Sequence, residues 1–278
     1  MINKHESFES IVEECQKGER EALDKMIKML SDENDKSSSG FFEFLVKMGE
    51  HAVKPLIEAL AVSKGQYSLP IIEALGEIGD PLAIYALTTK LKDKDWQVRS
   101  TAALAIGKIK HPKAVKALTR ALKDKYFAVR RNAARALGEI KGSEAVGALI
   151  KALGDKDWQV RSTAAWALGE IKDPQAVIPL TKKLKDKDRE VVIRAIDALR
   201  AIGDPRAAKA LINVLGEKGE IRYKAVWALG EMREPTAAEP LTRFLKDPDW
   251  RVQKKATWAL KRIKGEEEKR EIDIELEE

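Results

Sequence analysis

The sequence predicts an all-α protein in which short helices pair and stack as an α-α superhelix, a solenoid. Three observations support this fold class. Similar segments open every 30 or 31 residues, at Val98, Val129, Val160, Val191, Ile221 and Val252. Within each segment, apolar residues recur at helical spacing, and glycine or proline interrupts the pattern at constant positions. A fixed period of this length is typical of repeat proteins, in which stacked neighbours bury one continuous core.

Residues 93–123 are the clearest example of the repeat. One apolar helical face is followed, after a break at His111-Pro112, by a second apolar face, so we expect two helices per repeat. Asp95 is the expected N-cap of the first helix. Aspartates before a proline are the expected caps of the second type of helix, with the proline at its first position: Asp80, Asp173 and Asp204.

The repeat extends back to the N-terminus, because earlier glycines precede similar apolar patterns. We expect eight helix pairs, which begin near Gly18, Gly49, Gly79, Lys110, Lys141, Lys172, Gly203 and Glu234. Residues 1–17 are the expected N-terminal cap, with a capping helix at 6–16, and SDENDKSSSG at 31–40 is the expected flexible loop. The solenoid is expected to form a single domain over 1–264, followed by an acidic tail at 265–278.

Charge is distributed unevenly along the chain. The net charge is +6, but the last 14 residues alone carry −6. This asymmetry fits either binding of an acidic partner or nucleic acid, or simply a soluble surface with a charged end. In the tail, Ile272, Ile274 and Leu276 alternate with acidic residues. The tail is therefore expected either to pack one apolar face on the last repeat or to be a disordered, solubilising segment.

Cysteine content and hydropathy favour a cytoplasmic protein. The single cysteine, Cys15, cannot form an intramolecular disulfide, and no signal peptide or long apolar run is evident. Cys15 shares a helical face with Phe8, Ile11 and Val12, so a packed thiol is favoured over a nucleophile. The high Lys and Glu content is compatible with a thermophilic source.

The repeat units resemble a known family. DKDWQVRSTAALAIGKI, DKYFAVRRNAARALGEI and DKDWQVRSTAAWALGEI are similar to HEAT repeats of the short phycobilin-lyase-like class, over nearly the whole chain. The resemblance implies that the helices with a Val-Arg pair line a concave surface. It also implies a structural ladder of Asp93 with Arg99, Asp124 with Arg130, and Asp155 with Arg161. Val192 and Gln253 depart from the pattern, so an interrupted ladder is expected in the last three repeats, with a doubtful partner for Arg222.

Helical geometry predicts which positions of the Val-Arg helix face away from the core. At about 100° per residue, positions 97, 100, 101, 104 and 108 cluster opposite the apolar face. Position 104 is central among them, and its equivalents are Leu104, Arg135, Trp166, Asp197, Trp227 and Trp258. Large rigid aromatic side chains dominate interface energetics. We therefore expect a partner-binding site at the three tryptophans, with charge complementarity from Arg131, Arg135, Arg194, Lys224, Lys255 and Arg262.

Structural roles are the alternative for both sets of tryptophans. Trp166, Trp227 and Trp258 could merely cover neighbouring helices. Trp96, Trp158 and Trp250 occupy another constant position, at the first residue of the helix, where Phe127 is in the same register. For this second set the structural role is favoured, because an aromatic side chain there can pack on the adjacent turn.

The function expected is a non-catalytic protein- or peptide-binding scaffold. Nucleic-acid binding is an alternative confined to the basic C-terminal repeat, since the exposed positions of the three preceding repeats are net acidic. No cofactor or metal site and no membrane partner are expected, because the three histidines are scattered and no phosphate-binding loop or nucleophile–base pair is evident. The family resemblance implies a bilin-lyase-like role as a second alternative.

Overall fold

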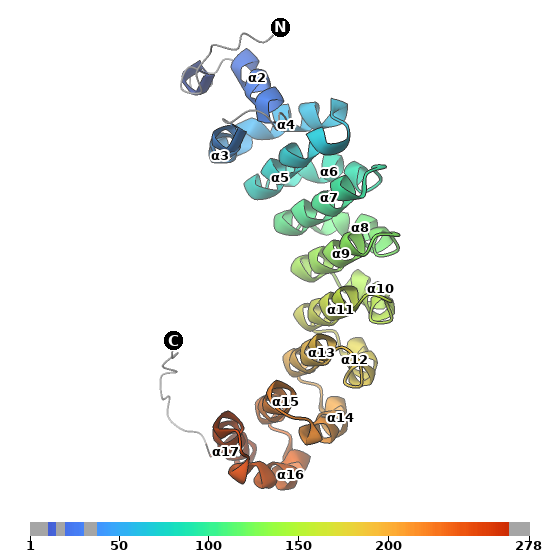
Figure 1. Ribbon diagram of the computed structural model, residues 1–278, viewed down its shortest axis with the longest axis vertical. Coiled ribbons are helices and arrows are strands. Elements are labelled where there is room, and N and C mark those ends of the chain that lie inside the picture. The colour runs from blue at the N-terminus through green and yellow to red at the C-terminus, as the bar shows by residue number, and fades with distance from the viewer. Residues whose placement is uncertain (1–10, 15–19, 31–37, 267–278) are drawn as a thin grey trace. The chain divides into compact units, whose positions relative to one another are not determined.

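All regular secondary structure in the described part of the chain is helical. The computed structural model describes residues 11–14, 20–30 and 38–266, and it confirms the predicted all-α solenoid, in which helices follow one another in pairs (Figure 1). Eight such pairs, from α2 with α3 to α16 with α17, lie within these ranges, as the repeat predicts. The chain divides into two compact units, Met1–Ala167 and Leu168–Glu278, with the boundary inside helix α11 (Trp158–Ile171).

The first unit contains the N-terminal pairs. Its longer helices from α5 onward, the odd-numbered ones, lie side by side in one row. We call these helices, and the odd-numbered helices of the second unit, the inner helices. The α-helices before α11 are α2 (Arg20–Leu30), α3 (Ser38–Met48), α4 (Glu50–Val62), α5 (Leu69–Ile78), α6 (Ile84–Lys90), α7 (Trp96–Ile109), α8 (Val115–Ala121), α9 (Phe127–Ile140) and α10 (Val146–Ala152). The 3-10 helices are η1 (Gly65–Ser68), η2 (Pro81–Ala83), η3 (Pro112–Ala114) and η4 (Ser143–Ala145).

The second unit repeats the arrangement. Its inner helices α13, α15 and α17 contact one another in that order. Its α-helices after α11 are α12 (Val177–Lys183), α13 (Arg189–Ile202), α14 (Ala208–Asn213), α15 (Glu220–Glu231), α16 (Ala238–Thr242) and α17 (Trp250–Lys264). Its 3-10 helices are η5 (Pro174–Ala176), η6 (Pro205–Ala207), η7 (Val214–Gly216), η8 (Pro235–Ala237) and η9 (Arg243–Lys246).

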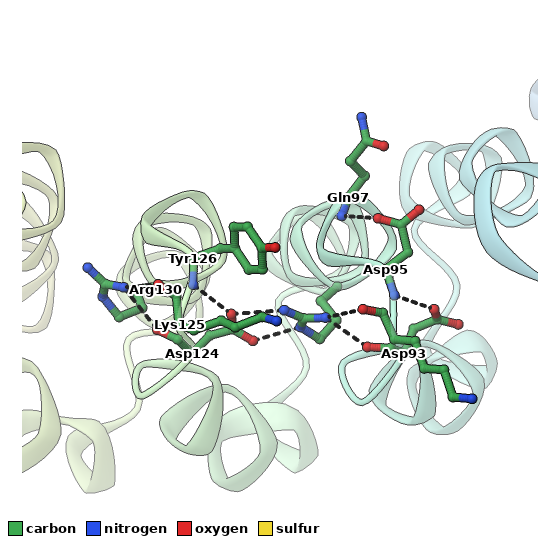
Figure 2. Close-up of polar contacts among 9 residues, drawn as sticks. Asp93, Asp95, Gln97, Asp124, Lys125, Tyr126 and Arg130 are labelled. Atoms are coloured by element: carbon green, nitrogen blue, oxygen red, sulfur yellow. Dashed lines mark hydrogen bonds and ion pairs between the residues drawn. The ribbon is translucent and has the colours of Figure 1, made fainter.

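The predicted capping aspartates occupy the cap positions. The Asp95 carboxylate accepts the backbone N–H of Gln97 at 2.9 Å, which caps α7 (Figure 2). Asp80, Asp173 and Asp204 accept the N–H two residues on, at 2.8–2.9 Å, before a proline at the first position of a 3-10 turn. The second helix of each of these repeats therefore begins with one turn of 3-10 helix, and its α-helical part follows directly.

Several expectations concern residues at or beyond the edges of the described ranges. The loop expected at 31–40 is shorter at its C-terminal end, because 38–40 form the first turn of α3. The remainder of that loop, the Cys15 thiol and residues 267–278 of the acidic tail lie outside the described residues.

The Arg-Asp ladder connects neighbouring repeats. Arg99 donates through Nε and Nη2 to the Asp124 carboxylate at 2.6 and 3.0 Å, and through Nη1 to the carbonyl oxygens of Asp93 and Lys94. Figure 2 shows Asp124 in the turn beside Lys125 and Tyr126. The expected pairing of Asp93 with Arg99 is thus corrected, because the carboxylate comes from the following repeat and the same turn offers only carbonyl oxygens.

The same offset continues along both units. Arg130 donates to the Asp155 carboxylate at 2.7 Å through both Nε and Nη2, and of Asp124 in its own turn it binds only the backbone carbonyl. Arg222, for which the sequence indicates a doubtful partner, forms an ion pair with the buried Asp247. The ladder is therefore present at Arg222 as well. The expectation of a doubtful partner was wrong, because the carboxylate comes from the following repeat and not from the turn before Arg222.

Candidate binding surface

The indoles of the predicted site are half-buried against the preceding helix. A Cβ atom at Gly138 would lie 2.8 Å from Cζ3 of Trp166, and one at Gly230 would lie 2.6 Å from Cζ3 of Trp258. Each glycine therefore leaves space that a ring edge fills. Trp166 belongs to the first unit and Trp258 to the second, so each contact is a property of its own unit.

Trp227 packs on an arginine instead. Arg200 occupies the position of the repeat at which Gly138 and Gly230 stand, nine residues after the opening Val or Ile. The Arg200 guanidinium lies over the Trp227 ring, with Cζ 4.1 Å from the ring centroid. Helices α13 and α15 thus meet through a stacked Arg-Trp pair where other inner helices meet through glycine.

Cations and aromatic rings alternate across the second unit. Lys255 Nζ lies 5.3 Å from the Trp227 centroid, 4.6 Å from that of Trp258 and 5.8 Å from that of Tyr223. The Arg262 guanidinium lies over the other indole, 5.2 Å from the Trp258 centroid. We call this group the cation–aromatic stack; its members are Arg200, Tyr223, Trp227, Lys255, Trp258 and Arg262.

The two arginines of the stack have no anionic partner among the described residues. The Nε atoms of Arg200 and Arg262 are enclosed and make no hydrogen bond. Neither guanidinium forms an ion pair with any residue in the described ranges. Their charge is instead stabilised by aromatic faces, an attraction of about 0.5–2 kcal/mol each depending on solvent exclusion. The two Nη atoms of each guanidinium carry further N–H donors that can bind an external acceptor.

Sequence comparison identifies the repeats. A family model for HEAT repeats matches residues 69–128, 121–185, 148–220 and 210–272, which is well over half of the chain. The chain belongs to the HEAT-repeat family. No curated protein matches it.

Solved structures share the fold of this HEAT-repeat protein. A crystal structure of an engineered protein is 25% identical with a TM-score of 0.56, covering 92% of this chain and 81% of its own. YibA of Escherichia coli is 24% identical with a TM-score of 0.67, covering 95% of this chain and 99% of its own. The second likeness shows the fold alone.

Two predicted basic residues are engaged within the HEAT repeats themselves. Lys224 Nζ binds Asp197 at 2.9 Å, and Arg194 Nε binds Glu190 at 2.8 Å one helical turn away. Helical spacing places Arg194 and Glu190 on one face, and stacking brings Lys224 against Asp197. Each of these charges therefore already has a carboxylate within the protein, and a contact of either residue with a partner stays a prediction.

The predicted arginines of the first unit both lie on α9. Arg135 is exposed on α9, in a shallow hollow beside Leu104. The ion pair of Lys108 with Glu77 borders the same hollow. Arg131 is half-buried on α9. Both arginines belong to the first unit, whereas Trp227 and Trp258 belong to the second.

The predicted exposed face is narrower than expected. Ser100 was placed on that face, but it is only 8% exposed because Asn132 of α9 covers it and donates to its hydroxyl at 2.9 Å. Ser162 and Ile193, at equivalent positions, are also buried. This edge of α7, α11 and α13 is therefore covered, while Leu104 and the tryptophans at its equivalent positions stay half-exposed.

The tryptophans at helix starts are the more exposed set. Trp96 stacks on Tyr126, which lies in the turn before α9 of the following repeat. The ring centroids are 5.4 Å apart and the angle between the ring planes is 19°, yet Trp96 remains 36% exposed. Trp158 is 42% exposed and Trp250 61%. Packing on the adjacent turn is therefore visible for Trp96, whereas Trp250 presents most of its ring to solvent.

Sequence reasoning missed two members of the stack. Arg200 is detectable because it replaces a glycine that recurs at this position of the repeat, at Gly107, Gly138, Gly169 and Gly230; Lys261 of the last repeat also departs from it. Tyr223 stands at the position equivalent to Ser100, where an aromatic ring is exceptional among these repeats. Departures from a repeat consensus are thus the signal that points to this surface.

The described residues hold neither a cluster of metal ligands nor a membrane-spanning helix. Within those ranges, no three or more His, Cys, Asp or Glu side chains gather closely enough to hold a metal ion. None of the helices described there has the length and apolar character needed to cross a membrane.

Proposed function

We propose that this HEAT-repeat protein is a non-catalytic scaffold that binds a protein or peptide on its inner helices. The proposed contact surface in the second unit is the cation–aromatic stack on α13, α15 and α17. The observation that carries the proposal is the arrangement of two half-buried indoles between three cations.

Preorganisation supports this proposal. Trp227 and Trp258 are held by cations on their faces, and Trp258 is further held by contact at Gly230. Binding a partner would therefore cost little side-chain entropy, while aromatic and arginine side chains are the types that dominate interface energy. Trp166, Arg131 and Arg135 in the first unit remain predicted contacts of the same scaffold.

Nucleic-acid binding is the second candidate. Helix α17 favours it, because the sequence WRVQKKATWALKRIK carries six basic and no acidic residues. Carboxylates on the neighbouring helices oppose it, since Asp197, Glu220 and Glu231 would repel a polyanion that followed the stacked repeats. The candidate is therefore limited to the C-terminal end of the chain.

An affinity capture with mass-spectrometric identification tests the scaffold. The wild-type protein should retain a particular protein after nuclease treatment, and Trp227→Ala and Trp258→Ala should each lose it. Trp250→Ala is the matched control, because it removes an exposed indole from the same helix outside the stack. Thermal unfolding of every variant separates lost binding from lost structure.

The outcomes discriminate the candidate functions. Capture that is abolished by nuclease would replace the scaffold with nucleic-acid binding. Equal loss in Trp250→Ala and Trp258→Ala would contradict a site at the stack. The phycobilin-lyase-like subclass stays a prediction, and a visible absorption band from a tetrapyrrole complex would be its sign. A cytoplasmic location likewise stays a prediction.

A further inference from the structure

Resting on the proposed function, we propose that the partner presents an acidic segment to the cation–aromatic stack. Its carboxylates bind the guanidiniums of Arg200 and Arg262, and apolar side chains between them cover the exposed edges of Trp227 and Trp258. This assigns a chemical class to the partner and gives the arginines a role distinct from that of the indoles.

The unmatched arginines carry the inference. In the same three helices, three other cations have carboxylate partners: Arg194 binds Glu190, Lys224 binds Asp197, and Arg222 binds Asp247. Arg200 and Arg262 differ, because they contact aromatic rings and no carboxylate of the described residues. A guanidinium offers a planar set of donors that fits a carboxylate in a bidentate geometry.

The charge of helix α17 is complementary to an acidic segment. Of its six basic residues, Arg251 is bound to Asp249 at 2.7 Å, beside the helix start. Lys254 lies 5.0 Å from the Trp250 ring, and Lys255 belongs to the stack. The helix thus presents positive charge next to its aromatic rings, and an acidic chain would be attracted over a distance of about 8–10 Å at physiological ionic strength.

The ring faces favour a peptide over a single-stranded nucleic acid. Bases bind by stacking on open aromatic faces. Here two cations already lie over each indole, Arg200 and Lys255 over Trp227, and Lys255 and Arg262 over Trp258. A base would have to displace a cation to stack. A carboxylate needs no displacement, because it binds the cations in place.

Fluorescence anisotropy with defined probes tests the inference. The first probe is a labelled peptide in which Glu alternates with Phe, and the second replaces each Glu by Gln. A labelled single-stranded oligonucleotide of matched charge is the third. We expect the Glu peptide to bind at least about tenfold more tightly than the Gln peptide, with affinity that falls as salt rises.

Substitutions locate the interaction. Arg200→Gln and Arg262→Gln should each weaken binding of the Glu peptide about tenfold, the loss of one charge-assisted contact. Arg206→Gln is the matched control, because this exposed arginine of the same unit is held by Asp204 at 2.6 Å. Its affinity should be unchanged, and unfolding midpoints of all three variants verify the fold.

Several results would overturn the acidic partner. Equal affinity for the Glu and Gln peptides would indicate an apolar partner, and tighter binding of the oligonucleotide would indicate nucleic acid. Absence of peptide binding, or the same loss in Arg206→Gln, would also contradict the inference. If capture of a protein still depended on Trp227 and Trp258, the scaffold would stand and only the partner class would be wrong.

Discussion

Arg99 binds the carboxylate of Asp124, 25 residues further along the chain, and only carbonyl oxygens of its own turn. Arg130 and Asp155 keep the same separation, as do Arg222 and Asp247. Each pair is a side-chain bridge between consecutive repeats. The side chains of Arg99 and Asp124 are 9% and 13% exposed, so solvent screens this charge pair only weakly.

Loss of the Asp124 carboxylate should destabilise the first unit. We expect Asp124→Asn to lower the free energy of unfolding by about 3–5 kcal/mol, since it leaves the Arg99 charge buried without its partner. Asp95→Asn should cost well under about 1 kcal/mol, because asparagine is an equally good N-cap. Urea unfolding followed by circular dichroism measures both. Similar midpoints for the two variants would contradict a stabilising role for the bridge.

The ladder predicts a loss of stability in acid. Burial acts to raise the pKa of the Asp124 carboxyl, but hydrogen bonds from Arg99 and from the Tyr126 backbone outweigh it, so the pKa lies below its ordinary value of 3.8. The pKa of Asp155 is lowered by the corresponding balance, with Arg130 as the principal hydrogen-bond donor. Their stabilisation is therefore complete above the unfolded-state pKa and is lost as pH falls through the lower folded-state pKa.

Thermal unfolding from neutral to strongly acidic pH tests this dependence. The wild type should lose stability progressively as the pH falls below about 4. The double variant Asp124→Asn, Asp155→Asn should start lower at neutral pH and show a shallower decline. Parallel curves for the two proteins would assign the acid sensitivity to other carboxyl groups.

Close helix contact predicts that Gly230 does not tolerate a side chain. A Cβ atom there would lie 2.6 Å from both Trp258 Cζ3 and Ala259 Cβ. Gly230→Ala should therefore destabilise the second unit by about 1–3 kcal/mol through overpacking. Gly147→Ala is the matched control, since nothing lies within 4 Å of its Cβ position in α10, and it should stabilise by about 1 kcal/mol. Unfolding followed by intrinsic tryptophan fluorescence would measure the loss of stability in Gly230→Ala.

Lys141 ends helix α9 in the left-handed conformation, with φ at 58°. Because a side chain is strained there, Lys141→Gly should stabilise the protein by about 0.5–1 kcal/mol after the entropic cost of glycine is subtracted. Lys151→Gly, within helix α10, should instead destabilise by about 1 kcal/mol. A lower unfolding midpoint for Lys141→Gly would refute the strain.

The sequence was sufficient for the features that one repeat contains. Its period predicts the helix pairs, and local capping chemistry predicts Asp95. Contacts between repeats were harder to predict from the sequence, because they depend on how adjacent helices are offset. Asp124 was therefore assigned to Arg130 instead of Arg99, and Ser100 was placed in solvent although Asn132 covers it.

The candidate surface shows the same division. Trp227 and Trp258 were recognisable from their common position in the repeat. The stacking of Arg200 on Trp227 was not, since it requires the spacing between α13 and α15. Likewise, Lys224 faces Asp197 only once those two helices are packed.

The constant offset of 25 residues in the Arg-Asp bridge bears on how such a chain changes length. Removal of residues 100–130 would place Asp155 25 residues after Arg99, so the new junction would recreate the bridge with the acid of a different repeat. Duplication of the same segment would likewise keep each of these arginines 25 residues before an aspartate, so every bridge could form. Recombination by whole periods could therefore lengthen or shorten the protein without a compensating mutation at the ladder.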